Sequence, residues 1–355
     1  MDRPARLVTR TYRFPAEWER HDATWIAWPH HEPDWPGKFA PIPWVYAEIA
    51  RTLAASERVE ILCHNETVRE QAAACLAAHH VGANVRLHLR GTDRVWLRDS
   101  APTGLLAADG TLAWCDWDFN AWAKYDNYAA DATIGEFIAS VSGAPREMPL
   151  RPDGSRFVLE GGGIDTDGRG TILVTEEWLL SGVQDRNPGL GRADYEQLFA
   201  RALGCTTTVW LGEGCVGDDT HGHVDDIARF VAPGVVVLAY EPDPADENHR
   251  RSHDNFQRLA SARDASGEPL HVVTLPFPRA VMMDGQRLPA SYANFYIANQ
   301  AVLVPTFNDP NDRVALNLLA ELFPDREIVG IHALDLVWGL GTLHCLTQQQ
   351  PSPRA

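Results

Sequence analysis

Short apolar runs that follow turn sequences such as Ala-Asp-Gly and Ala-Pro-Gly predict four β-hairpins along the chain. Between the hairpins, apolar residues recur at three- and four-residue intervals, which is typical of amphipathic helices. Single strands are predicted at residues 207–211 and 271–275, and a strand-and-helix set at residues 44–63. The hairpins are predicted at residues 94–116, 157–176, 223–240 and 291–307, and the helices at residues 131–142, 192–203, 247–262 and 312–322.

The order of these elements recurs with a period of between 60 and 70 residues, since 61 residues separate Asp99 from Glu160 and 65 separate Glu160 from Asp225. Such a period predicts an α/β fold in which five pseudosymmetric ββαβ-like modules form a propeller-like ring. A doubly wound α/β sheet is the alternative, but it would need regular βαβ crossovers and fewer hairpins. In a ring, the first strand of each module can point its end at one axial site. No low-complexity linker divides the chain, so residues 1–355 are expected to form a single catalytic domain with short tails.

Composition and charge narrow the possible functions. A hydrophobic content of 45% and twelve tryptophans indicate a sizeable core. The net charge of −17 disfavours nucleic acid and anionic membranes as partners, and it would attract a small cation, although ordinary acidic enzymes share such a charge. No run approaches the ~18 apolar residues of a membrane span. The six cysteines contain no CxxC pair and the first residues lack an apolar signal segment, so we expect a reduced, cytoplasmic setting.

The first candidate for chemistry is Cys345, within the run Gly-Leu-Gly-Thr-Leu-His-Cys-Leu-Thr-Gln-Gln-Gln-Pro at residues 339–351. We interpret this run as the end of a strand that brings a thiol beside glycine, where a ligand can approach closely. The alternative is that Cys345 is a buried and inert cysteine. That is the expected state of the other five cysteines, because no polar residues surround them in the sequence.

A second candidate is the acid-rich run at residues 218–226, whose charges are too dense for a core. In strand geometry His223 and Asp225 face the same side, where they could supply a proton shuttle beside an anion for a cation. An acidic surface loop is one alternative. A zinc site is another, because the pattern from His221 approaches the His-x-His-x-Asp-His run of metallo-β-lactamase-like hydrolases, without its last histidine.

Two further segments carry acids beside turns. Trp96 and Asp99 are placed near a strand end, where the ring could stack on a flat cation while the acid accepts its N–H groups. The alternative is a pair between Arg98 and Asp99 beside a core tryptophan. Glu160 precedes three glycines, which would allow a ligand to approach the backbone closely. A plain glycine turn after a strand is the alternative. The run does not match a nucleotide-binding loop. A thiol, a histidine and several acids together suit covalent attack on a planar cation.

These motifs resemble the agmatine deiminase family, which belongs with bacterial-type peptidylarginine deiminase to the guanidino-group-modifying pentein superfamily. The resemblance runs nearly end to end, and its most diagnostic block is the final His-Cys-Leu-Thr-Gln-Gln-Gln-Pro. It is carried by residues 14–29, 96–99, 116–122, 158–163, 186–188, 218–226, 290–299 and 344–351.

The resemblance implies a five-module α/β propeller that hydrolyses agmatine to N-carbamoylputrescine and ammonia without a metal or an organic cofactor. It implies Cys345 as the nucleophile, which forms an amidino-thioether, and His223 as the general acid and base. It further implies that Asp99 and Asp225 hold the guanidinium, with Glu160 as another acidic contact.

The contacts expected on the substrate side are an aromatic wall from Trp96 and further contacts from Asp219, Gly341 and Thr342. The chain departs from the family pattern before the thiol, where Leu340 and Thr342 replace glycine and asparagine. Another guanidine, such as free or peptidyl arginine, is therefore an alternative substrate.

Two further departures are Trp178, where a smaller residue is common, and Asp118, where glycine is usual. Neither removes a residue of the predicted catalytic set.

Relatives in this family suggest that the protein forms a homo-oligomer, which we expect to be a dimer. From other functional classes, a zinc hydrolase built on His221 and His223 and a silent binding protein for cationic amines are the alternatives.

Overall fold

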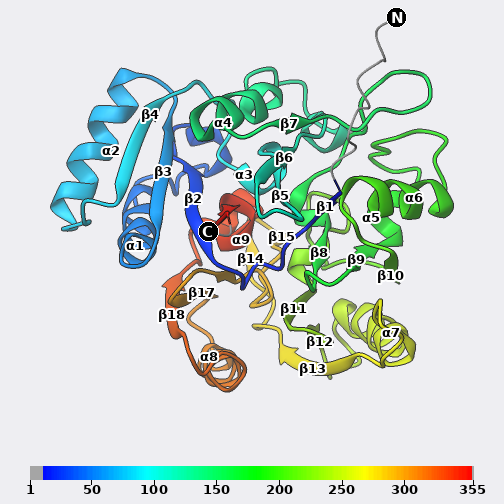
Figure 1. Cartoon of the computed structure of the whole chain (residues 1–355). Helices are drawn as coiled ribbons and strands as arrows, with labels where there is room; N and C mark the ends of the chain where they lie inside the picture. Colours follow the sequence, from blue (N-terminus) through cyan, green and yellow to red (C-terminus); the bar gives the residue numbers. More distant parts are fainter. Residues whose placement is uncertain (1–10, 354–355) are drawn as a thin grey trace, which may run out of the picture.

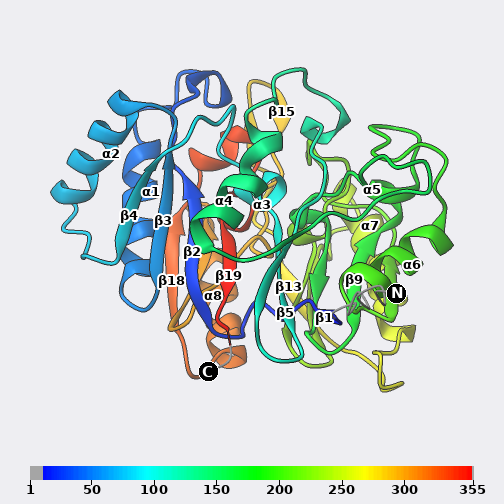
Figure 2. The same cartoon turned by 45° about the horizontal axis from the view of Figure 1, so that its top comes forward.

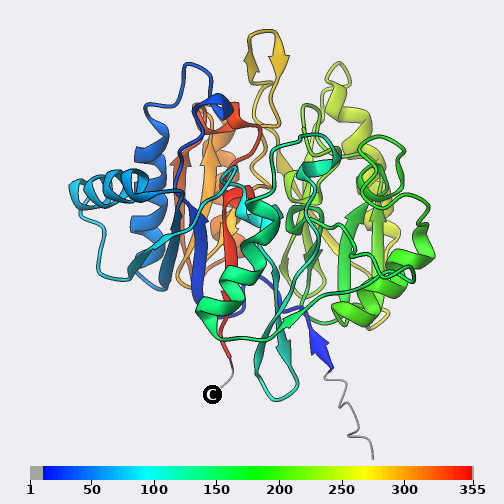
Figure 3. The same cartoon turned by 90° about the horizontal axis from the view of Figure 1, so that it is seen from above.

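A computed structural model of the chain describes residues 11–353, in which five groups of strands surround a common centre and carry helices on their outer sides (Figure 1). The described residues form six sheets, of which five have three or four strands. The sixth is a hairpin of β14 (Met282–Met283) and β15 (Gln286–Arg287), which projects from the ring in the turned views (Figures 2 and 3). Short tails were predicted at both ends of the chain, and residues 1–10 and 354–355 lie outside the described residues.

Three modules have the predicted ββαβ order. In each of them an antiparallel pair of strands is followed by helix and then by a strand parallel to the second one. Their helices are α5 (Glu176–Leu180) and α6 (Arg192–Ala202), α7 (Glu247–Ser261), and α8 (Asn311–Leu322). Their strands are β8 (Asp165–Thr166), β9 (Thr171–Thr175) and β10 (Thr207–Leu211); β11 (Ala228–Ala232), β12 (Val235–Tyr240) and β13 (His271–Pro276); and β16 (Tyr296–Ile297), β17 (Ala301–Thr306) and β18 (Glu327–His332).

A fourth module has the same core order and an additional edge strand from the N-terminal part of the chain. Here β5 and β6 are antiparallel, β7 is parallel to β6, and β1 joins the outer edge of β5. The elements are β1 (Tyr12–Arg13), β5 (Thr103–Ala107), β6 (Leu112–Cys115), α4 (Ile134–Ser142) and β7 (Arg146–Glu147).

The remaining module combines the two ends of the described chain. Strand β19 (Gln348–Pro351) pairs antiparallel with β2 (His21–Ala27), so that Gln348 lies opposite Trp25. Beyond β2, parallel strands continue the sheet. The other elements of this module are α1 (Ile42–Ala54), β3 (Arg58–Cys63), α2 (Glu66–Ala78) and β4 (Val85–Leu89).

The core lies between the sheets and their helices. Strand β2 is almost wholly buried, which is typical of strands that are covered on both faces. Helix α1 packs through Ile42, Tyr46, Ile49 and Leu53, whose spacing of three and four residues forms one apolar face. The bounds of the predicted helices and single strands agree with the structure to within three residues. No helix in residues 11–353 is long and apolar enough to cross a membrane.

Short helical turns stand immediately before the first strands of four modules. They are α3 (Leu97–Ser100) before β5, η4 (Gly161–Gly163) before β8, η5 (Val224–Asp226) before β11, and α9 (Leu343–Leu346) before β19. Helix α9 lies at the centre of the ring in Figure 1. These turns carry the chemistry-bearing residues of the sequence.

The local assignments made for these residues from sequence are therefore wrong. Asp99 and Cys345 do not end strands, and His223 and Asp225 do not share a strand face. An extended strand would send every second side chain to the opposite face. The turns that precede the strands instead hold neighbouring polar groups at the centre.

Candidate active site

A cavity of about 320 Å³ opens at the centre of the ring. Five of the residues predicted from sequence line it, namely Trp96, Asp99, Asp219, Gly341 and Cys345. The other lining residues are His31, Pro33, Asp34, Pro36, Arg94, Trp122, Tyr125, Thr220, Gln286, Trp338, Gly339 and Leu340.

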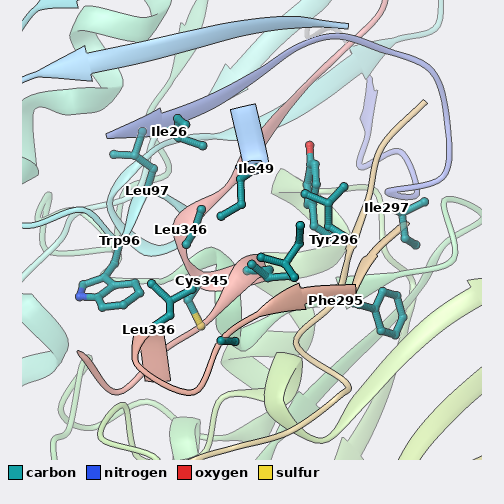
Figure 4. Packing of buried hydrophobic residues seen from close by; sticks show 14 of the residues in the cluster. Ile26, Ile49, Trp96, Leu97, Phe295, Tyr296, Ile297, Leu336, Cys345 and Leu346 are labelled. Atoms are coloured by element: carbon teal, nitrogen blue, oxygen red, sulfur yellow. The ribbon is translucent and has the colours of Figure 1, made fainter. Parts of the chain in front are cut away.

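The thiol of Cys345 sits at the inner wall of this cavity on α9. The residue is only 6% exposed, and Figure 4 shows it packed among Trp96, Leu336 and Leu346. Its Sγ lies 3.1 Å from Asn294 Nδ2 and 3.7 Å from Asp225 Oδ2. Burial and the nearby carboxylates raise the pKa of the Cys345 thiol well above its usual value. The free protein therefore holds this residue as a neutral thiol.

The turn that carries the thiol is fixed by Asn294. The amide oxygen of Asn294 accepts hydrogen bonds from the backbone N–H of His344 at 3.0 Å and from Thr342 Oγ1 at 2.7 Å. First-turn N–H groups of a helix have no intrahelical partner, so this contact satisfies one of them. Thr342 thus supports Asn294 and does not line the cavity. Before it, Leu340 has a φ of 69°, a conformation that glycine adopts without strain.

Sequence reasoning gave no role to Asn294, although it lies within a block that carries the family resemblance. A signal was available, because Asn294 stands just before β16. Asp99, Glu160, Asp225 and Cys345 occupy corresponding places before the first strands of the other four modules.

The imidazole of His223 is buried between two acids. Its Nδ1 lies 3.7 Å from Asp99 Oδ1, and its Nε2 lies 3.4 Å from Glu160 Oε2. Burial alone would lower the pKa of His223, but Asp99 and Glu160 raise it to about 9. The backbone N–H of His223 donates to Asp218 at 2.9 Å, so the acid-rich run also stabilises its own loop. At neutral pH His223 is protonated and can act as an acid.

Both carboxylate oxygens of Glu160 are occupied. Arg186 Nε donates to Oε1 at 3.0 Å, and Trp178 Nε1 donates to Oε2 at 2.7 Å. Burial would raise the pKa of Glu160, but Arg186 and His223 lower it to about 2. These contacts leave Glu160 as an anion that faces His223. The departure at Trp178 has a structural role, since its indole holds this carboxylate.

The carboxylate of Asp99 is held by two donors. The backbone N–H of Gly162 donates to Oδ1 at 3.0 Å, and Trp122 Nε1 donates to Oδ2 at 2.8 Å. Burial raises the pKa of Asp99 to about 6, with His223 lowering it and the neighbouring carboxylates raising it. Trp122 lies in a left-handed turn with φ of 59° between Ala121 and Ala123, which also have positive φ. Such strain in a non-glycine segment is often found at functional sites.

The carboxylate of Asp225 has one engaged and one free oxygen. Oδ2 accepts from His344 Nδ1 at 2.7 Å. Oδ1 is buried and has no hydrogen-bond partner among the described residues, and the same is true of His223 Nδ1. Buried polar atoms in native proteins are nearly always hydrogen-bonded, so two free ones, on residues that contact Asp99 and Cys345 of the cavity wall, point to a ligand.

At the cavity rim, two acids are paired with cations. Asp219 contacts Lys124 Nζ and accepts from Tyr125 Oη at 2.7 Å. Asp34 accepts from Arg94 Nη1 at 2.9 Å, and it was not recognised from sequence because nothing local distinguishes it from a surface acid.

The zinc alternative receives no support from the geometry. His221 Nε2 lies 2.8 Å from Ser181 Oγ, and His221 joins no ligand group with His223. In residues 11–353, one group has an arrangement that could hold a metal, and it consists of Asp225, Asp226 and Cys345. Of these three residues Cys345 lines the cavity, and the group includes neither histidine.

Together with the relatives described next, this meeting of a buried thiol, an imidazolium and several carboxylates places the chain among the hydrolases that act on C–N bonds of guanidino groups. Over residues 13–351 the chain matches the family described as Porphyromonas-type peptidyl-arginine deiminase, and it belongs to that family. The agmatine deiminase of Ectopseudomonas mendocina is 34% identical over 366 residues, which cover 97% of this chain and 96% of that protein.

Solved structures share the fold over nearly the whole chain. The agmatine deiminase of Enterococcus faecalis has a TM-score of 0.88 at 30% identity, covering 97% of this chain and 96% of that one. A putative arginine deiminase from Porphyromonas gingivalis has a TM-score of 0.85 at 34% identity, covering 96% and 98%. The family prediction and the α/β fold class are therefore confirmed.

Proposed function

We propose that the protein is an agmatine deiminase, which hydrolyses agmatine to N-carbamoylputrescine and ammonia through Cys345. The observation that carries this proposal is that Cys345 and Asp99 line one cavity while Asp225 and His223 lie directly behind them, each 3.7 Å away. Asp225 Oδ1 is buried there and has no hydrogen-bond partner among the described residues. The relatives named agmatine deiminase favour this substrate. Deimination of another guanidine, such as free or peptidyl arginine, is the alternative.

In this proposal the planar guanidinium lies between Asp99 and Asp225. Carboxylates accept its N–H groups in charge-assisted hydrogen bonds, which fix the plane of the cation and localise its charge. The indole of Trp96, which lines the cavity, supplies an apolar wall. Glu160 acts mainly through His223, because its oxygens already have partners.

The first chemical step forms a bond between Cys345 Sγ and the guanidinium carbon and gives a tetrahedral adduct. His223 then gives its proton to one departing nitrogen, the C–N bond breaks, and ammonia leaves an amidino-thioether on Cys345. A protonated His223 with a pKa near 9 suits this order of events.

In the second step the now neutral His223 takes a proton from water, and the resulting hydroxide attacks the amidino carbon. Collapse of this adduct breaks the C–S bond while its hydroxyl group loses a proton to solvent, which releases the neutral ureido product and returns the thiolate. The protein ends with His223 protonated, and the sum is guanidinium plus water giving a urea plus ammonium.

The thiol requires activation, since burial and three carboxylates hold its pKa high. We propose that the cationic substrate supplies it, because a positive charge beside the sulfur lowers the pKa of the thiol and releases the proton to solvent. The ultraviolet thiolate absorbance of Cys345 should rise when a guanidine analogue binds. An unchanged titration of Cys345 with a saturating analogue would contradict this activation.

The substrate is tested by measuring ureido product from agmatine, arginine and a blocked peptidyl arginine, each with chelator present. We expect turnover of agmatine to exceed that of the other two by at least about tenfold, since a charged carboxylate or a peptide must enter an acidic cavity. Faster turnover of arginine or of the peptidyl arginine would support the same reaction but identify a different substrate. Absence of turnover on all three would refute the proposed function.

The pH dependence of kcat/KM is expected to be bell-shaped. Asp99 has a pKa of about 6 and must be ionised to bind the cation, so activity falls as the pH drops through about 6. His223 has a pKa of about 9 and must be protonated to release ammonia, so activity falls again above about pH 9. Initial rates from pH 5 to pH 10 check both limbs, and a flat profile from pH 8 to pH 10 would remove His223 from the acid role.

For the distal ammonium of agmatine we propose Asp219 as a partner, because its carboxylate lines the cavity rim. Asp219→Asn is expected to raise KM for agmatine about tenfold with little change in kcat, since a charge pair is lost in both ground and transition states. Asp118→Asn is the matched control, as Asp118 also pairs with a cation but lies outside the cavity. Equal KM values for the two variants would exclude the contact.

A cytoplasmic location is also proposed. Its support is that all six cysteines are free thiols in the structure, as expected in a reducing compartment. The homodimer expected from relatives stays a prediction, which the mass of the protein in solution would check.

A further inference from the structure

His344, next to the thiol, contacts two carboxylates at once. Its Nδ1 lies 2.7 Å from Asp225 Oδ2, and its Nε2 lies 2.8 Å from Glu17 Oε2. All three side chains are at least 95% buried. The ring of His344 therefore bridges two buried carboxylates, one through each of its nitrogens.

Glu17 is the fixed end of this bridge. Its carboxylate also contacts Arg229 Nη2 at 2.8 Å and Arg98 Nη2 at 3.2 Å, and it accepts from the backbone N–H of Ile297 at 2.8 Å. Burial opposes its ionisation, but these cations and His344 lower the pKa of Glu17 well below its usual value. A buried carboxylate with this many partners is an immobile anion, so it can hold the imidazole of His344 in one orientation.

We propose that His344 and Glu17 are positioning residues, which aim the carboxylate of Asp225 at the substrate and keep it ionised. His344 engages Oδ2 and leaves Oδ1 without a hydrogen-bond partner among the described residues. Without this contact, the carboxylate could rotate and use either oxygen for other neighbours. This inference rests on the proposed function of Asp225 as a guanidinium partner.

The bridge also has an electrostatic effect. Asp225 lies in a cluster of negative groups, where like charges disfavour its ionised form. Burial opposes ionisation as well, yet His344 lowers the pKa of Asp225 below its usual value. The groups that face Asp225 from the surrounding elements are His344 and Cys345 on α9, His223 and Asp226 at η5, Asp99 on α3 and Arg229 on β11.

His344 is not a second candidate for the proton shuttle. Both of its nitrogens are held by acids. His223 Nδ1 has no hydrogen-bond partner among the described residues and lies 3.7 Å from Asp99 Oδ1, whose residue lines the cavity. The two histidines therefore have different tasks, proton transfer for His223 and orientation for His344.

The test compares His344→Gln and Glu17→Gln with wild type. His344→Gln removes one of the two ring contacts to the carboxylates, so KM for agmatine should rise about 10- to 100-fold, which is the range for a lost hydrogen bond to a charged group. Loss of His344 also raises the pKa of Asp225 toward that of Asp99, so the acid limb of kcat/KM should become steeper below about pH 6, because two carboxylates then titrate in it. Glu17→Gln, which removes the anion that orients His344, should shift both quantities in the same direction by less.

The matched control is His21→Gln. His21 is also buried and also pairs with a carboxylate, Glu57, at 3.4 Å, but it has no contact with Asp225. Like the test variants, His21→Gln should lower the melting temperature. Its KM for agmatine should stay within about twofold of the wild-type value, and its acid limb should stay within about 0.2 pH unit of the wild-type limb. If all three variants lose stability and none alters the acid limb, His344 and Glu17 are structural and the inference is overturned.

A binding measurement keeps this test separate from the proposed function. Calorimetric titration of agmatine into Cys345→Ala, with and without His344→Gln, reports affinity without turnover. We expect Kd to rise about 10- to 100-fold in the double variant. Equal Kd values would overturn the inference even if wild type turns over agmatine, whereas absent wild-type turnover of every guanidine would refute the proposed function.

Discussion

Cys345→Ala is expected to lower agmatine turnover by about 10⁴-fold or more, because removal of a covalent nucleophile leaves only binding and orientation to assist the reaction. The substituted thiol lies at the wall of the cavity and contacts Asn294 and Asp225. Colorimetric measurement of ureido product over hours would quantify the residual rate. Acid-quenched wild type should in addition carry an amidino adduct on the peptide that contains Cys345.

The control for this prediction is Cys115→Ala, which removes another buried thiol. Cys115 lies on β6 and does not line the cavity, and burial raises its pKa as it does for Cys345. Its loss should affect stability and leave kcat within about threefold. Retention of more than one per cent of activity by Cys345→Ala would contradict a covalent mechanism at this residue.

Gly162→Ala is expected to lower kcat/KM by about 100-fold or more while the protein stays folded. A Cβ on Gly162 would lie 2.6 Å from His223 Nδ1, 2.8 Å from Asp99 Oδ1 and 3.0 Å from Asp225 Oδ2. These contacts are too short, so the added methyl must push three groups of the site apart. Displacement of reacting groups by about 1 Å can cost about 100-fold in rate. Steady-state kinetics with agmatine would measure the loss.

Gly182→Ala provides the comparison, since a Cβ there meets no atom within 4 Å. Circular dichroism and thermal melts should show that both variants fold, and kinetics should separate them. Similar kcat/KM values for Gly162→Ala and wild type would mean that His223, Asp99 and Asp225 can rearrange freely, which contradicts a preorganised site.

The repeating order of hairpin, helix and strand could be predicted from the sequence because it depends on local patterns. Apolar spacing in helices such as α7 and the short buried strands such as β10 is visible in any single module. The period of the repeat also predicted that Asp99, Glu160 and Asp225 would lie close together at the axis of the ring. The family resemblance then implied that Cys345 is the nucleophile.

The turns that carry the active-site residues could not be predicted in the same way. Their conformation depends on partners from other modules, such as the amide oxygen of Asn294 that receives the N–H of His344. Such tertiary contacts override the intrinsic helix or strand propensity of the residues involved. The buried ion cluster was also missed, because Glu17 and Arg229 are far apart in sequence and each alone is typical of a surface residue.

The pairing of β19 with β2 determines the order in which activity can arise during synthesis. The thiol lies just before β19, so it leaves the ribosome after every other group of the cavity, including Glu17, Asp99 and His223. A nascent chain that ends before α9 therefore contains the acids and the imidazole of the site but no nucleophile. The turn that carries the thiol is continuous with the strand that completes the first sheet, so the last step of fold assembly and the arrival of the reactive group involve the same segment.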